Sequence, residues 1–204
     1  MLESNAIILA GGDSKRIGRE KATLKLGDST LIEIIIGKLW GVFQEIILVT
    51  DAPKLFEGLP VSITGDVFTT AAKSSLRGVH AGLSYSSSQV NFVMACDMPF
   101  LSLELVKLLN KYSSDYQAVV PRLEGYYQPL FAFYQRTCLE AIEYCLYRGY
   151  FKVSSFFPYV KARYVTEGEV TKVDPFYHSF FNINTPQDYQ KALELTFQED
   201  QKRS

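Results

Sequence analysis

A segment rich in glycine and cationic residues covers residues 9–21, with the sequence LAGGDSKRIGREK. Neither Gly11 nor Gly12 has a Cβ atom, so backbone N–H groups there can approach a phosphate chain closely. Four cationic side chains add donors for charge-assisted hydrogen bonds to phosphate: Lys15, Arg16, Arg19 and Lys21. These residue types at this spacing indicate a site for a small polyanion. The spacing differs from the dinucleotide fingerprint GxGxxG and from the phosphate loop GxxxxGK(S/T), which disfavours hydride transfer and NTP hydrolysis of those kinds.

A carboxylate, Asp97, is the second candidate, in the segment NFVMACDMPF. Pro99 cannot continue a strand ladder and Ser102 can cap a helix, so Asp97 is expected in the turn between a strand and a helix. Mg²⁺ in nucleotide sites keeps several waters and takes one or two carboxylates together with phosphate oxygens. Asp97 is therefore the candidate metal ligand, with a capping role as the alternative. Asp66 follows another short apolar run and is expected at the same edge of the fold.

Buried strands alternating with helices must position these segments. Almost continuously apolar runs, typical of parallel strands buried on both faces, cover residues 6–9, 45–50, 92–95 and 118–120. Helical patterns follow at residues 31–40 and 103–112, and Thr30 with Glu33 predicts a capping box. The sequence therefore predicts an α/β fold with a parallel sheet. Ligands of such sheets bind beyond the carboxyl ends of the strands, where the glycine-rich segment and Asp97 are expected.

The region from Tyr126 to Phe181 is rich in aromatic residues. Its patterns predict a strand at residues 130–134, a helix at 138–147 and a strand at 162–166. The simpler interpretation of the aromatic residues is a second packing layer, and the alternative is a lip for a flat ring system. No linker or repeat divides the chain, so one domain is expected over residues 1–204, with nucleotide binding in its N-terminal part and acceptor binding at about 120–190.

Composition limits the classes of partner. The chain has 204 residues, 21 Lys and Arg against 22 Asp and Glu, and a formal net charge of −1. A charge this small gives no field for a nucleic-acid backbone. No apolar run approaches the roughly 20 residues needed to cross a bilayer, and no basic export signal is seen, so a cytoplasmic protein without membrane or nucleic-acid partners is expected. Three cysteines without CxxC spacing are expected to be core thiols.

Four motifs carry a resemblance to a known family. LAGGDSKRIGREK resembles the LAGGxSxRMGxxK signature of the molybdenum cofactor guanylyltransferases, with Ile17 at the usual methionine. CDMPF is similar to the family's CDxPF, EGYYQPLFAFY to its glycine and QPL segment, and FFNINTPQDY to its F-N-x-N-T-P-x-D/E element. The matches are collinear from residue 9 to about residue 190. Two positions depart from the pattern: Thr50 replaces a frequent asparagine, and Ser74–Gly78, expected as a loop, replaces a Gly-Pro-Leu segment.

The resemblance implies a Rossmann-like nucleotidyltransferase fold, with a mostly parallel central sheet flanked by helices. It implies that the protein uses GTP and Mg²⁺ to join GMP to molybdenum-molybdopterin, with release of pyrophosphate. By position, it implies nucleotide contacts for Leu9, Ala10, Gly11, Lys21, Asp66 and Asp97, with Asp66 at the guanosine end and Asp97 at both GTP and Mg²⁺. Further partners expected on this basis are other molybdenum cofactor biosynthesis proteins or molybdoenzymes.

The expected chemistry is an in-line attack by an acceptor phosphate on the α-phosphorus of the nucleotide, which requires alignment and charge stabilisation but no protein nucleophile. Arg16 and Lys21 are the expected charge-stabilising residues. Asn182 and Asn184 alternate with apolar residues, which predicts a short strand with both amides on one face, toward the acceptor. The alternative is that these amides only brace the helix predicted to begin at Thr185, where Pro186 and Asp188 are typical of a helix start.

Two other functions remain open from the sequence. A cytidylyltransferase or sugar-phosphate nucleotidyltransferase would share the first motif, and turnover of CTP instead of GTP would reveal it. A catalytically silent GTP-binding module is the second alternative. Retention of both Lys21 and Asp97 disfavours the silent module, because binding alone could dispense with a metal-binding carboxylate.

Overall fold

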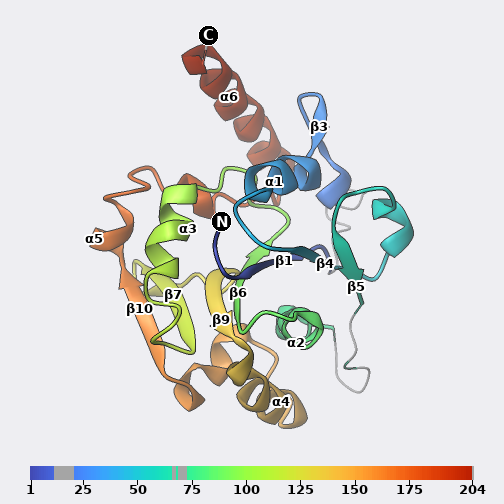
Figure 1. Ribbon diagram of the computed structural model, residues 1–204. Coiled ribbons are helices and arrows are strands. Elements are labelled where there is room, and N and C mark those ends of the chain that lie inside the picture. The colour runs from blue at the N-terminus through green and yellow to red at the C-terminus, as the bar shows by residue number, and fades with distance from the viewer. Residues whose placement is uncertain (12–20, 66–67, 69–72, 204) are drawn as a thin grey trace.

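The computed structural model describes residues 1–11, 21–65, 68 and 73–203, with side chains as far as residue 197. Within these residues a central eight-stranded sheet has the order β10-β7-β9-β6-β1-β4-β5, and β8 pairs with β7 (Figure 1). The strands are β1 (Asn5–Leu9), β4 (Ile46–Val49), β5 (Ser62–Thr64), β6 (Val90–Ala95), β7 (Ala118–Leu123), β8 (Tyr126–Tyr127), β9 (Phe131–Gln135) and β10 (Ala162–Thr166). Strand β9 runs antiparallel to β6 and β7, and β8 antiparallel to β7, whereas the other pairs are parallel.

Helices cover both faces of this sheet (Figure 1). They are α1 (Leu31–Leu39), α2 (Ser75–Tyr85), α3 (Leu103–Asn110), α4 (Leu139–Tyr147), α5 (Glu167–Val170) and α6 (Pro186–Arg203). Short 3-10 helices span Lys21–Thr23, Pro53–Phe56, Arg136–Cys138, Val153–Tyr159 and His178–Phe180, and a small hairpin pairs β2 (Lys25–Leu26) with β3 (Ser29–Thr30). The described helices include none that is both long and apolar enough to cross a bilayer.

The central strands β1, β4 and β6 are mostly apolar because successive side chains enter different cores. Ile8 of β1 packs in a cluster with residues of α1 and α3, whereas Ile7 packs with residues of α2 and α4. Both side chains are fully buried. The period-two alternation of a strand therefore places apolar residues on both faces, which confirms the prediction of a doubly covered sheet.

The aromatic-rich region forms the second of these cores. Tyr134 on β9 packs edge-on against Phe156, with ring centroids 5.5 Å apart, and Tyr127 packs against Phe157 at 5.3 Å. Burial raises the pKa of Tyr134 well above its usual value, and its hydroxyl donates to the backbone oxygen of Pro129 at 2.8 Å. The interpretation as a packing layer is confirmed for these rings, because Tyr134, Phe156 and Phe157 are buried and the partly buried Tyr127 packs against their cluster.

Helix starts follow the predicted capping chemistry. Thr30 Oγ1 accepts a hydrogen bond from Glu33 N, and Glu33 Oε2 accepts from Thr30 N at 2.7 Å, so the capping box is confirmed. These hydrogen bonds from Thr30 lower the pKa of Glu33. At the start of α6, Asp188 Oδ2 accepts a hydrogen bond from Thr185 N at 2.8 Å. The carboxylate therefore satisfies a backbone donor at the helix start, as the predicted cap requires.

Two expectations are wrong. Ser74–Gly78 is not a loop: Ser74 is the N-cap of α2, its Oγ accepts from Arg77 N, and the helix begins at Ser75. Residues 181–184 do not form a strand, because no ladder pairs with them. A backbone hydrogen bond, from Ile183 N to the backbone oxygen of Asp97 at 3.0 Å, holds this irregular segment against the turn after β6.

Candidate functional site

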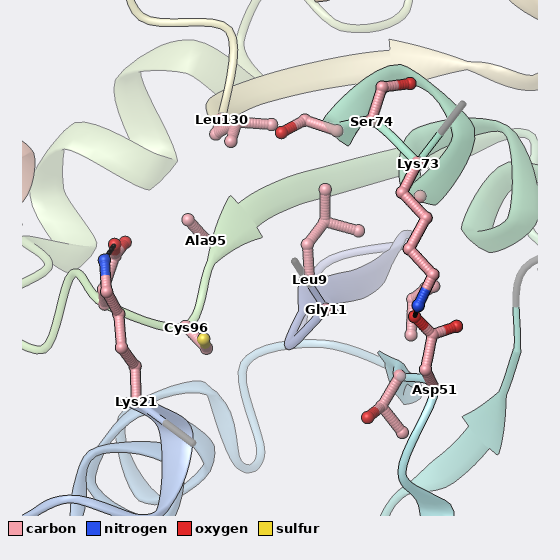
Figure 2. A pocket seen from close by; sticks show the side chains of 14 residues that line it. Leu9, Gly11, Lys21, Asp51, Lys73, Ser74, Ala95, Cys96 and Leu130 are labelled. Carbon is pink, nitrogen blue, oxygen red and sulfur yellow. Dashed lines mark hydrogen bonds and ion pairs between the residues drawn. The ribbon is translucent and has the colours of Figure 1, made fainter. Parts of the chain in front are cut away.

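The register of three neighbouring strands places one glycine and two aspartates side by side, just beyond the strand ends. Strand β1 lies between β4 and β6, and Leu9 is paired in register with both Val49 and Ala95. Gly11, Asp51 and Asp97 each follow two residues later, at the carboxyl end of their strand. Beyond this edge lies a cavity of about 330 Å³. Its lining residues are Leu9, Gly11, Lys21, Val49, Thr50, Asp51, Lys73, Ser74, Ser75, Gly78, Ala95, Cys96, Asp97 and Leu130 (Figure 2).

One end of the cavity carries a lysine bound by two polar side chains. Lys21 Nζ lies 3.2 Å from Asp97 Oδ2, and the two side chains are only 12% and 16% exposed. Lys21 also donates to Asn184 Oδ1. The lysine opens the 3-10 helix after the glycine-rich segment, whereas Asn184 precedes α6. Three distant parts of the chain therefore meet at this ammonium group.

The two carboxylate oxygens of Asp97 differ in their partners. Its Oδ2 contacts Lys21, but its Oδ1 is buried and has no hydrogen-bond partner among the described residues. A buried carboxylate oxygen without a partner is costly unless a ligand or ion completes it. The described residues hold no group of three or more acidic, histidine or cysteine side chains that could enclose a metal. Asp97 thus fits a Mg²⁺ ion that takes one carboxylate and fills its other positions with water and phosphate oxygens.

Glycine residues open the middle of the cavity. A Cβ atom built on Gly11 would meet no described heavy atom within 4 Å, so the space beside this backbone is free for a ligand. Gly78 lies in different surroundings, because a Cβ atom built there would be 3.4 Å from the Leu9 side chain. The first turn of α2 thus packs on the Leu9 side chain at ordinary van der Waals distance. The ligand space is thus bounded by backbone that carries little side chain.

The other end of the cavity carries a second lysine–carboxylate pair. Lys73 Nζ lies 2.8 Å from Asp51 Oδ2, with side chains 72% and 46% exposed. Figure 2 shows this pair and Lys21 on opposite sides of Leu9 and Gly11. Thr50, which precedes Asp51, is buried, and its Oγ1 accepts a hydrogen bond from Ala52 N at 3.1 Å. The two ends of the cavity therefore offer similar groups in different surroundings.

The structure places most of the predicted site residues. Leu9, Gly11, Lys21 and Asp97 line the cavity, and Ala10 is buried beside them, with its N–H bonded to the Val49 oxygen at 2.9 Å. Gly12, Arg16 and Asp66 lie outside the described residues.

The two asparagines do not act as a matched pair. Asn184 reaches Lys21, whereas Asn182 Nδ2 donates to the backbone oxygen of Phe180 at 3.0 Å. Without a strand there is no alternation to align them, so the expectation that both share one face of a strand fails. Of the two, Asn184 is the one with a hydrogen bond to a candidate site residue that the structure describes.

Sequence reasoning missed Asp51 and Lys73 as lining residues. The available signal was position, because Asp51 directly follows the predicted strand at residues 45–50, much as Asp97 follows the one at residues 92–95. It also missed a partner for His80, whose Nε2 lies 3.0 Å from Glu143 Oε1 although the histidine is buried.

The cysteines behave as core residues. Cys96, Cys138 and Cys145 are free thiols and buried. Burial raises the pKa of the Cys138 thiol to about 12, and burial also raises the pKa of Cys145. Both thiols are therefore protonated near neutral pH and poor nucleophiles.

The order and direction of the strands, with the candidate site at the carboxyl edge, are those of a Rossmann-like α/β fold. The sequence model of the family described as "MobA-like NTP transferase domain" matches residues 6–157. The chain belongs to this family of nucleotidyltransferases.

Individual relatives agree with this assignment. A protein of Pelotomaculum thermopropionicum named "Probable molybdenum cofactor guanylyltransferase" is 38% identical over 94% of this chain and 93% of its own length. The "Molybdenum cofactor guanylyltransferase" of Desulfosudis oleivorans is 34% identical over 91% of this chain and 92% of its own. The crystal structure of molybdopterin-guanine dinucleotide biosynthesis protein A from Archaeoglobus fulgidus matches with a TM-score of 0.84 and 29% identity, over 95% of this chain and 99% of that chain.

Proposed function

We propose that the chain transfers GMP from GTP to molybdenum-molybdopterin, forming the molybdopterin guanine dinucleotide cofactor and releasing pyrophosphate. The names of relatives that align with nearly the whole chain support this activity. The observation that carries the proposal is the Lys21–Asp97–Asn184 cluster, with its unpartnered carboxylate oxygen, at the edge of the sheet where nucleotides bind.

The reaction exchanges one phosphoanhydride bond for another. A terminal phosphate oxygen of the acceptor forms a bond to the α-phosphorus of GTP, and the bond from that phosphorus to the bridging oxygen breaks, with both electrons leaving on pyrophosphate. Lys21 holds positive charge beside the reacting phosphates, a position fixed by Asp97 and Asn184. Such fixed charge stabilises the oxygens on which negative charge grows. The protein thus contributes alignment and electrostatics, with no covalent intermediate.

Asp97 is the proposed ligand of Mg²⁺, through its buried Oδ1. When bound, the ion would supply Lewis-acid stabilisation of the phosphate oxygens. Gly11 and Gly12, with Leu9 and Ala10, are proposed to line the nucleotide. Arg16 and Asp66 stay predictions for charge stabilisation and for the guanosine end.

The acceptor side is proposed for about residues 120–190 of a single domain, with Asn184 as its link to Lys21. Asn182 stays a predicted acceptor-binding residue, although its amide is engaged with its own backbone. Other molybdenum cofactor biosynthesis proteins or molybdoenzymes, as recipients of the product, and a cytoplasmic location belong to the same proposal.

Pyrophosphate release with each nucleotide, with and without molybdenum-molybdopterin, tests the function directly. Release is expected with GTP only, and only when Mg²⁺ and the acceptor are both present. Faster release with CTP would identify a cytidylyltransferase instead. Tight GTP binding without release in the complete mixture would identify a silent nucleotide-binding module, and either result contradicts the proposal.

A further inference from the structure

We infer that Asp51 and Lys73 select the guanine base, with the Asp51 carboxylate accepting from the N1–H and the 2-amino group and the Lys73 ammonium donating to O6. This inference rests on the proposed use of GTP. It assigns a specific role to an ion pair at the cavity mouth that the reaction itself does not require.

The register of the sheet sets the separation of the two ends. Asp51 and Asp97 stand two residues beyond Val49 and Ala95, in strands that flank β1 on opposite sides. Neighbouring strands lie about 4.8 Å apart, so these two strand ends are separated by roughly 10 Å. A nucleotide whose phosphates lie at Lys21 and Asp97 must cross Leu9 and Gly11 to place its base toward Asp51 (Figure 2).

The chemistry of the pair matches guanine better than the other bases. Guanine presents two adjacent donors, N1–H and the 2-amino group, next to the acceptor O6. A carboxylate has two acceptor oxygens for the two donors, and an ammonium group has donors for O6. Adenine and cytosine each present one amino group beside ring acceptors, and uracil presents one donor between two acceptors. None of these offers two adjacent donors to a carboxylate.

The surroundings of the pair leave it accessible to a base. Both side chains are more exposed than those of Lys21 and Asp97. An exposed ion pair contributes only about 0–1 kcal/mol, so a base can replace solvent around it at little cost in stability. The neighbouring Thr50 is buried, and its hydroxyl is bonded to Ala52 N, so it braces the backbone that carries Asp51.

Asp51→Asn is the first test, with dissociation constants measured for GTP, XTP and ITP. An amide at this position loses one of two acceptors, and hydrogen bonds to charged groups are worth about 1.5–3 kcal/mol, so GTP binding is expected to weaken roughly 10- to 150-fold. XTP carries an oxygen at C2 that accepts from the new amide, so its binding is expected to improve. ITP lacks the 2-amino group, so the preference for GTP over ITP is expected to shrink.

Lys73→Met gives a second, distinct signature. Both GTP and ITP carry O6, so this variant is expected to weaken their binding by the same factor and to leave their ratio unchanged. Asp115→Asn, the same chemical change at an exposed turn that does not line the cavity, is the matched control and is expected to change no ratio.

The outcomes separate this inference from the proposed function. If Asp51→Asn leaves the GTP-to-XTP ratio of the dissociation constants unchanged while the parent protein turns over GTP, base selection by Asp51 is wrong and the proposed function stands. If the parent protein prefers CTP in turnover, the proposed function fails first. A changed GTP-to-XTP ratio in the Asp115 control would also overturn the inference, because the effect would then not depend on the cavity.

Discussion

Two lysine–carboxylate pairs lie at the ends of one cavity, and their surroundings differ. Lys21 and Asp97 are 12% and 16% exposed and share a third partner, Asn184, whereas Lys73 and Asp51 are 72% and 46% exposed. Water screens the exposed pair, so an exchange of partners there costs little. The nearly buried pair lies in a lower dielectric, where fixed charge acts strongly on a ligand. Identical residue types are thus suited to catalysis at one end and to recognition at the other.

Asp97→Asn is expected to have the largest effect. A neutral amide loses the charge that holds Mg²⁺ against the phosphates, and losing such an electrostatic element costs roughly 10²–10⁴ in rate. Pyrophosphate release measures the loss, and the thermal unfolding midpoint checks that the fold is kept. Activity equal to that of the parent protein would show that Asp97 does not bind the metal.

Lys21→Ala is expected to reduce turnover more than GTP affinity, by about 10²–10³, because the ammonium group stabilises charge that grows during the reaction. Separate measurement of kcat and of the GTP dissociation constant makes the distinction. The matched control is Lys25→Ala, at an exposed lysine in the β2–β3 hairpin. Equal losses in affinity and in kcat/KM, with kcat unchanged, would mean that Lys21 binds the ground state and the transition state equally.

Gly11→Val probes the space that joins the two ends. A Cβ atom there meets no described heavy atom within 4 Å, so the unfolding midpoint is expected to stay unchanged while nucleotide affinity falls. A steric cost of about 1–3 kcal/mol corresponds to roughly 5- to 150-fold weaker binding. Gly82→Ala is the opposite control, because its Cβ would collide with the Ile7 side chain and destabilise the fold. Unchanged affinity in Gly11→Val would place the nucleotide elsewhere.

Asn184→Ala is expected to act on the acceptor side through Lys21. Loss of one hydrogen bond to a charged group, about 1.5–3 kcal/mol, should raise the concentration of molybdenum-molybdopterin required while GTP affinity stays nearly constant. Asn182→Ala is the natural comparison and is expected to do less, since its amide binds a backbone oxygen. A fall in GTP affinity with unchanged acceptor dependence would assign this segment to the nucleotide instead.

Local signals explain how much of the fold the sequence predicts. Strand β1 is recognisable because both of its faces are buried, and the start of α1 is recognisable because Thr30 and Glu33 form their capping box within one turn. Helix α2 is harder to recognise from the sequence because Gly78 and Gly82 are weak helix formers. The structure shows why glycine is needed at position 82, since a Cβ atom there would lie 2.4 Å from the Ile7 side chain of β1.

Contacts between distant segments explain what the sequence leaves out. Lys21 comes at the end of the glycine-rich segment after β1, and Asp97 comes after β6, the neighbour of β1 in the sheet. Lys21 and Asp97 can therefore be predicted as neighbours. The ion pair of Asp51 and Lys73 depends on where the chain before α2 meets the end of β4, which no local pattern encodes. The irregular path of residues 181–184 likewise depends on contacts with distant segments, among them the hydrogen bond from Ile183 N to the backbone oxygen of Asp97 and the one from Lys21 to Asn184.

The smallest effect is expected for the stability of the exposed pair. Removing an exposed ion pair changes the free energy of unfolding by about 0–1 kcal/mol, so Lys73→Met and Asp51→Asn should each shift the unfolding midpoint by less than about 4 °C. Lys21→Met should shift the midpoint further, because the nearly buried Asp97 carboxylate then loses the ammonium group that pairs with its Oδ2, while its Oδ1 already has no partner among the described residues. Thermal unfolding of the three variants without nucleotide measures this difference. Equal shifts would mean that burial does not distinguish the two pairs, and the division between a catalytic end and a recognition end would lose its physical basis.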